Sequence, residues 1–222
     1  MRITYNAPVI LTYTLICVVI TGLDSSIFAN AEGHTGTLSQ MLFMVYPFGF
    51  PEMNLNNPLA YFRLFSHAMG HANWAHLVGN FSFILLLGPI LEEKYGSRLI
   101  LLLLFMTAFI TGILNAALFD NSLLGASGEV FMMILLVSFT NARRGTIPLT
   151  FILVALLFLG KEIYGAMAAQ DQISQFAHII GGVCGGVFGY LISPKTNPVG
   201  SSPKTQTSPG SGLDLTDLTD AV

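Results

Sequence analysis

Residues 99–119 read LILLLLFMTAFITGILNAALF, a run without a charged side chain. At about 1.5 Å per residue, a helix of this length crosses the roughly 30 Å hydrocarbon core of a bilayer. Five other apolar runs occur along the chain, at residues 8–28, 74–91, 125–139, 147–160 and 173–192. The fourth and fifth runs in chain order are short, but longer neighbouring helices can shield a short span. The sequence therefore predicts an all-α membrane protein with six transmembrane helices.

The overall composition supports this prediction. Apolar residues make up 53% of the 222 residues and charged residues only 9%, with a mean hydropathy of +0.67. Ordinary soluble domains carry about 25% charged residues. The net charge of −3 is small and says little about partners, and no basic run suggests a nucleic-acid partner. Cys17 and Cys184 lie within apolar runs, where buried thiols usually pack as small apolar groups.

Basic side chains are distributed unevenly between the connections of a six-span chain. With the N-terminus in the cytoplasm, only Arg63 and Lys161 fall on the outer side. The other basic residues then fall on the cytoplasmic side: Arg2, Lys94, Arg98, Arg143, Arg144, Lys195 and Lys204. Cytoplasmic loops of membrane proteins carry an excess of Lys and Arg. Both termini are therefore predicted to be cytoplasmic.

Residues 1–192 are predicted to form one membrane domain, followed by a disordered cytoplasmic tail, 193–222, rich in Ser, Thr, Pro, Gly and Asp. The external first loop, 30–73, is long enough to suggest a functional role or packing on the membrane surface. The first run has an alternative interpretation as a cleaved signal peptide, because residues 28–31 resemble a cleavage site. Its length and the charge asymmetry favour a retained span.

Four polar side chains are predicted to share one depth in the outer half of the bilayer. His76, Asn80, Ser127 and His178 all lie near the start of the second, fourth and sixth runs, which enter from the outside. At 1.5 Å per residue, each lies within roughly 10 Å of the outer boundary. Polar groups inside spans are costly and usually functional.

The chemistry of these four side chains assigns them different roles. Imidazole can take a serine proton near neutral pH, so Ser127 and His178 are candidates for nucleophile and general base. Ser127 lies at a helix N-terminus, where its own N–H favours an oxyanion. His76 and Asn80 are four residues apart, share a helix face, and can donate to the same oxyanion. No acidic residue of the sixth run is placed to orient His178, which predicts a dyad.

Small residues support an approach of the sixth helix to the fourth. Gly181, Gly185 and Gly189 repeat every four residues, and such rows let two helix backbones pack closely. Gly181 lies three residues after His178, on nearly the same face. Close packing there would bring His178 towards Ser127.

Three motifs together resemble the rhomboid family of intramembrane serine proteases. Gly125-Ala126-Ser127-Gly128 resembles its nucleophile motif, residues 177–181 (AHIIG) resemble its base motif, and residues 76–80 (HLVGN) resemble its H-x-x-x-N oxyanion motif. The resemblance covers about residues 61–192. It implies a six-helix fold, no metal or other cofactor, and single-pass transmembrane proteins as substrates.

Further residues carry the same resemblance and imply supporting roles around the site. Arg63 resembles the arginine of the family's first loop, and His67 and His71 fall where the family often has histidines. Glu92 and Gly96 resemble an E-x-x-x-G element after the second helix. Arg63 and Glu92 are expected to anchor the first loop, and the two histidines to bond loop carbonyls.

Three residues depart from the family pattern. Phe62 replaces the tryptophan of a Trp-Arg pair. Phe131 stands where some members have a tyrosine that stacks on the catalytic histidine. Glu129 stands where a small or apolar residue is usual, and its place in the first turn favours a carboxylate through the helix dipole.

The leading hypothesis is an intramembrane serine endopeptidase in a bacterial or archaeal plasma membrane. A metal site at the histidines is disfavoured, since His67-Ala68-Met69-Gly70-His71 lacks the glutamate of H-E-x-x-H. Two other functions stay open: a non-catalytic rhomboid relative that binds membrane proteins, and a small transporter or channel. Such binders lack the serine or the histidine, whereas transporters usually show paired charges or broken helices.

Overall fold

The computed structural model describes residues 5–27, 37–140, 146–168 and 173–192, without the side chains of 37, 158–159, 161–168 and 173–175. These residues form helices joined by loops. The α-helices are α1 (Pro8–Ile27), α2 (Thr37–Leu42), α3 (Pro58–Ser66), α4 (Trp74–Tyr95), α5 (Ser97–Leu118), α6 (Ser127–Val137), α7 (Leu149–Ala168) and α8 (Ile173–Ile192). Two short 3₁₀ turns, η1 (Pro51–Met53) and η2 (His67–Met69), lie in the first loop.

Helices occur at all six predicted runs. Within the described residues, α1, α4 and α5 are long and apolar enough to cross a membrane, whereas α6 and residues 176–192 of α8 form shorter apolar segments. The prediction ended the second run at residue 91 and the fifth at 160, but α4 and α7 continue to Tyr95 and Ala168. The candidate cleavage site at 28–31, the Arg143–Arg144 pair and the tail 193–222 lie outside the described residues.

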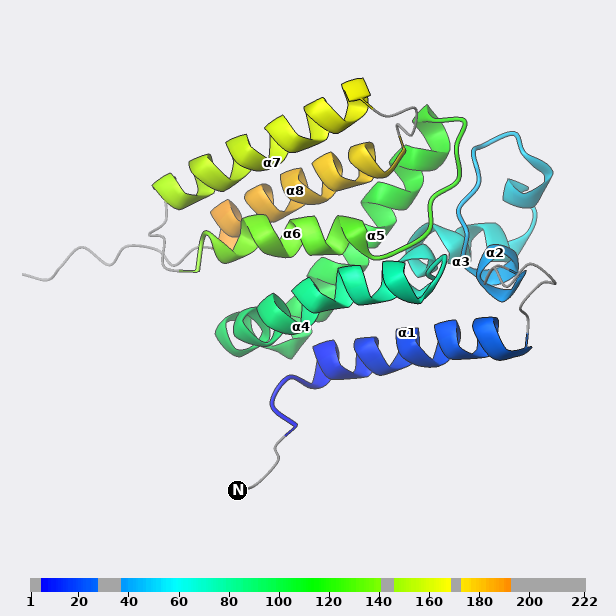
Figure 1. Cartoon of the computed structure of the whole chain (residues 1–222), viewed down its shortest axis with the longest axis horizontal. Helices are drawn as coiled ribbons and strands as arrows, with labels where there is room; N and C mark the ends of the chain where they lie inside the picture. The colour runs from blue at the N-terminus through cyan, green and yellow to red at the C-terminus, as the bar shows by residue number, and fades with distance from the viewer. Residues whose placement is uncertain (1–4, 28–36, 141–145, 169–172, 193–222) are drawn as a thin grey trace, which may run out of the picture.

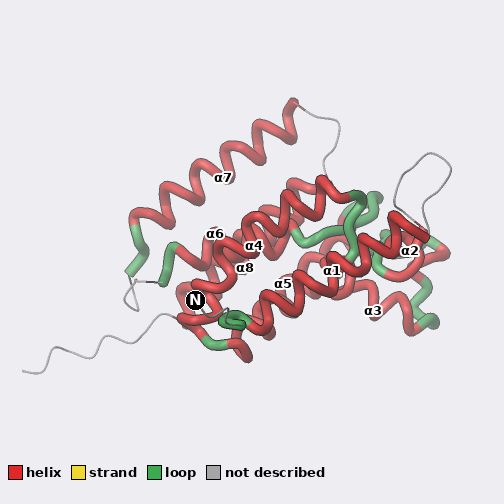
Figure 2. The backbone as a smooth tube through the Cα atoms, turned by 60° about the horizontal axis from the view of Figure 1, so that its bottom comes forward, coloured by secondary structure: helices red, strands yellow, loops and turns green. Residues whose placement is uncertain are grey.

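The helices form a layered bundle with α6 near its centre. Figure 1 shows α1, α4, α6, α8 and α7 in that order across the molecule, and contacts join each neighbouring pair. α5 crosses behind them and touches α4, α6 and α8. Figure 2 shows α7 set apart at the edge of the bundle. The helix that begins at Ser127 therefore lies between α4 and α8.

Both ends of α1 are attached to α4. The Glu92 carboxylate, only 3% exposed, accepts hydrogen bonds of 3.0 Å from the backbone N–H groups of Val9 and Ile10. These N–H groups begin a helix and have no partner within it. At the other end, the Trp74 indole N–H donates to the Ser25 hydroxyl at 3.0 Å. Glu92 therefore anchors the start of α1, whereas it was expected to anchor the first loop.

Buried charged groups organise the first loop. Asp24, within α1, accepts hydrogen bonds of 3.1 Å from the N–H groups of Leu38 and Ser39 at the start of α2. Arg63 of α3 donates to the carbonyl oxygens of Glu52 and Met41, and its guanidinium lies near the Tyr46 ring. Arg63 thus binds two separate parts of the loop, which agrees with its expected anchoring role.

Candidate functional site

A tight backbone turn delivers Ser127 to the start of α6. Gly125 has φ +118°, a conformation that residues with a side chain rarely adopt. Its N–H donates to the His67 carbonyl at 2.9 Å, and Leu123 exchanges two backbone hydrogen bonds with Val45. The first loop therefore holds the segment before Ser127 in place.

The backbones of α6 and α8 meet beside Ser127 and His178. A Cβ atom at Gly181 would overlap the Gly128 carbonyl oxygen, and one at Gly185 would overlap that of Met132. Gly128 follows Ser127 directly, and Gly181 lies less than one turn after His178. The predicted glycine contact therefore places Ser127 and His178 at the same level on adjacent helices.

Phe131 supports the candidate base from the next turn of α6. Its ring centroid lies 4.3 Å from that of His178, with a tilt of 42° between the planes. Tilted aromatic pairs at this separation are attractive. Ser127 and His178 are both partly exposed, whereas the residues between Ser127 and Phe131 are buried. Phe131 therefore stacks on His178 although it lacks the hydroxyl of a tyrosine.

His76 and Asn80 approach the same turn from α4. A Cβ atom at Gly125 would lie 2.6 Å from His76 Cε1, 2.8 Å from His76 Nε2 and 3.6 Å from Asn80 Nδ2. The two side chains therefore lie close to the backbone two residues before Ser127. Asn80 is 8% exposed, and its Nδ2 group has no hydrogen-bond partner. A buried amide donor without a partner is costly, and it is available to a negatively charged oxygen atom.

His67 and His71 are buried beside this group in different ways. His67 Nε2 lies 3.0 Å from the Ala108 carbonyl of α5, a helix carbonyl rather than the loop carbonyl expected. Because a carbonyl only accepts, Nε2–H is the donor. The His71 ring lies 5.1 Å from that of His76 in an edge-to-face arrangement. Burial lowers the pKa of His67 to about 4 and that of His71 to about 3, so both are neutral at pH 7.

The part of the chain that the structure describes contains no group of three or more His, Cys, Asp or Glu side chains suited to a metal ion. The arrangement instead brings a hydroxyl, an imidazole and hydrogen-bond donors to one level of the bundle. Such an arrangement can perform acyl transfer through a serine ester, with the base and the oxyanion donors on separate helices.

Asp24 was not predicted from the sequence as a structural residue, and the burial of Glu129 was not predicted either. Asp24, which is fully buried, fixes the start of α2. Glu129 lies in the first turn of α6, as expected, but it is 1% exposed and its Oε2 atom has no hydrogen-bond partner. A signal was present for both, because acidic residues within apolar runs usually need a partner.

Comparisons with known proteins show which family this chain resembles. A family model described as Rhomboid domain matches residues 58–195, which is more than half of the chain. Rhomboid-related protein 2 from Mus musculus is 30% identical over 165 residues. That alignment covers 62% of this chain and 53% of the mouse protein, so the chain spans about half the length of this relative.

Proposed function

This chain belongs to the rhomboid family, and on that premise we propose that it is an intramembrane serine endopeptidase with a Ser127–His178 dyad. The observation that carries the proposal is the backbone contact between Gly128 and Gly181, which sets the two residues at one level on α6 and α8. The proposed fold has six spans with both termini in the cytoplasm, in a bacterial or archaeal plasma membrane.

In the proposed mechanism, the Ser127 hydroxyl attacks the scissile carbonyl while His178 accepts its proton. The carbonyl oxygen becomes an oxyanion, which accepts hydrogen bonds from His76, Asn80 and the Ser127 N–H. His178 then returns the proton to the leaving amine, and an acyl-enzyme remains. Water activated by His178 attacks the ester and releases Ser127. Each oxyanion donor typically contributes about 3 to 4 kcal/mol to such a step.

The proposed substrates are single-pass transmembrane proteins cleaved near the outer membrane boundary. A substrate helix uses its carbonyl groups in its own hydrogen bonds, so it must unwind locally before attack. Residues such as Gly and Pro weaken a helix. Substrates are therefore expected to carry them close to the scissile bond.

Cleavage of a model single-pass substrate by the purified chain in liposomes tests the proposal. Ser127→Ala and His178→Ala should abolish cleavage. Ser82→Ala, which removes an exposed hydroxyl bonded to its own helix, should leave the rate unchanged. Cleavage by Ser127→Ala at the native rate would contradict the proposed mechanism.

A second measurement separates the protease from a non-catalytic membrane-protein binder. A serine-directed fluorophosphonate probe should label the native chain at Ser127 and should fail to label the Ser127→Ala variant. A folded native chain that stays unlabelled and binds the substrate without cutting it would favour the binder. Solute flux that survives Ser127→Ala would favour a transporter.

A further inference from the structure

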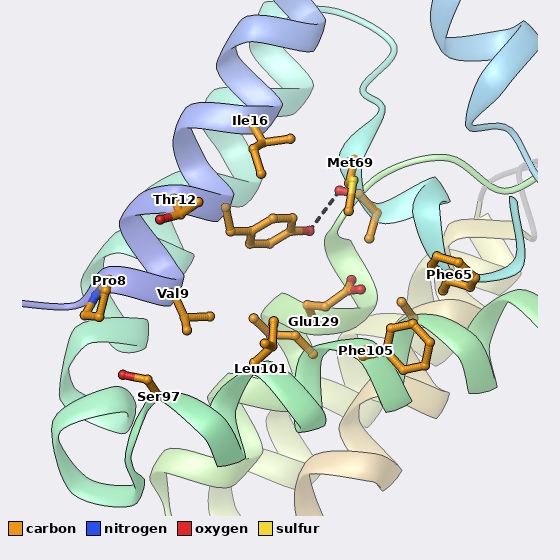
Figure 3. A pocket seen from close by; sticks show the side chains of 14 residues that line it. Pro8, Val9, Thr12, Ile16, Phe65, Met69, Ser97, Leu101, Phe105 and Glu129 are labelled. Carbon is orange, nitrogen blue, oxygen red and sulfur yellow. Dashed lines mark hydrogen bonds between the residues drawn. The ribbon is translucent and has the colours of Figure 1, made fainter. Parts of the chain in front are cut away.

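A cavity separate from the Ser127 region opens between α1, η2 and α5. Its volume is about 470 Å³, within the range of about 300 to 1,000 Å³ typical of small-molecule sites. Tyr13, Ile16, Met69, Leu101, Phe105 and Glu129 are among the side chains that line it. Figure 3 shows the Glu129 side chain reaching into the space between α1, Met69 and α5.

Glu129 gives this apolar cavity a single acidic group. Its side chain is 1% exposed, and Oε2 has no hydrogen-bond partner. Glu92, the comparable buried acid of α4, accepts two backbone N–H groups instead. A buried carboxylate oxygen without a partner is costly unless a donor or a cation reaches it or the group takes up a proton. None of the residues that line the cavity is basic.

The exposed part of the lining, at Ile16 and Leu101, forms the mouth of the cavity and lies on helices expected to border lipid. Leu101 is 58% exposed and Ile16 is 39% exposed, and both lie on predicted spans. A molecule can therefore enter sideways from the bilayer. The Tyr13 hydroxyl donates to the Ala68 carbonyl at 2.8 Å and keeps a lone pair that can accept a hydrogen bond.

We propose that this cavity is a binding site for a lipophilic primary amine. The ammonium group donates hydrogen bonds to the Glu129 carboxylate and to the Tyr13 hydroxyl, and its alkyl chain lies between Ile16 and Leu101. Charge complementarity selects this class of ligand, because a buried acid in an apolar cavity matches a cation with an apolar tail. The site does not depend on the proposed peptidase activity, since Glu129 is two residues from Ser127 and points roughly 200° away around the helix.

Photolabelling of the full chain in lipid nanodiscs tests this site. The probe is dodecylamine that carries a diazirine in its chain, with peptide mapping by mass spectrometry. Labels should fall on α1 and α5. Excess dodecylamine should compete with the probe, and dodecanol, which has the same chain without the charge, should not.

Two variants and one control decide the outcome. Glu129→Gln should lower specific labelling about tenfold or more, because a hydrogen bond to a charged group is lost. Glu93→Gln changes an exposed acid of α4 and should have no effect. Unchanged labelling of a folded Glu129→Gln chain, or equal competition by dodecanol, overturns the proposal. If Glu129→Gln does not fold, Leu101→Trp serves as the second variant, because its indole should block entry of the probe at the mouth of the cavity. Unchanged labelling of a folded Leu101→Trp chain also overturns the proposal.

Discussion

Replacing Gly181 by alanine should separate α6 from α8 and slow cleavage. The added Cβ would lie 2.7 Å from the Gly128 carbonyl carbon and 2.9 Å from its Cα, and it would overlap the carbonyl oxygen. Carbon atoms in contact normally lie about 3.5 to 4.0 Å apart. The atoms that the new Cβ meets belong to the backbone of Gly128 and cannot rotate away as a side chain could. The helices α6 and α8 must therefore move apart by about 1 Å to restore normal contact distances.

This displacement acts directly on the proposed dyad. A misplacement of about 1 Å can cost about 100-fold in rate, and overpacking typically costs about 1 to 3 kcal/mol of stability. Gly181→Ala should therefore fold with a lower thermal midpoint and cleave a model substrate about 100-fold more slowly. Gly186→Ala is the matched control on α8, because its Cβ would meet only the Phe151 ring at 3.2 Å, which can yield. Wild-type cleavage by a folded Gly181→Ala chain would refute the reasoning.

Other substitutions and a change of pH test further parts of the molecule. Asn80→Ala should lower kcat about 100- to 1,000-fold with little change in KM. The control Ser82→Ala, at an exposed position of the same helix, should leave kcat unchanged. A kcat for Asn80→Ala equal to that of the native chain would show that Asn80 does not bind the oxyanion. Glu92→Gln should cost about 1 to 3 kcal/mol in the free energy of unfolding, because the amide leaves one N–H of α1 unpaired, and Glu93→Gln should change it by less than about 0.5 kcal/mol. Burial lowers the His67 pKa from 6.5 to about 4, so the unfolded chain binds more protons between these values and stability falls as pH drops below 6.5. The loss from this group should be about 2 kcal/mol between pH 7.5 and pH 5, and a thermal midpoint that is equally pH-dependent in His67→Gln would contradict it.

Hydropathy predicted a helix at each of the six apolar runs, because lipid leaves the backbone few alternatives, but it did not predict α2 and α3 within the first loop. The α8 helix has its predicted bounds, Ile173–Ile192. The end of α4 was predicted too early, because the charged side chains after Leu91 imply solvent. Glu92 is nevertheless buried, since the unpaired N–H groups of α1 satisfy it. That partner lies 82 to 83 residues away and leaves no local pattern.

The candidate site was predictable as a set of residues but only partly as a geometry. Spacing along α4 and the glycines of α8 indicated which faces meet, and Gly181 lies against α6 as expected. The carbonyl partner of His67 depends on how the first loop packs against α5, which the sequence alone does not specify. The burial of Glu129 likewise depends on the position of α1.

The glycine row of α8 sets how closely this helix approaches α6, but it does not determine how far along α6 it stands. Because Gly181, Gly185 and Gly189 recur every four residues, a slide of about 6 Å, which is four residues at about 1.5 Å each, would again place a glycine beside Gly128. Two aromatic contacts near the start of α8 break this degeneracy. Phe176 packs on Phe119 at 4.3 Å, and His178 packs on Phe131. Aromatic side chains thus fix the position of α8 along α6, and with it the alignment of the candidate dyad. The distance between the two helices is fixed instead by glycines, which carry no side chain.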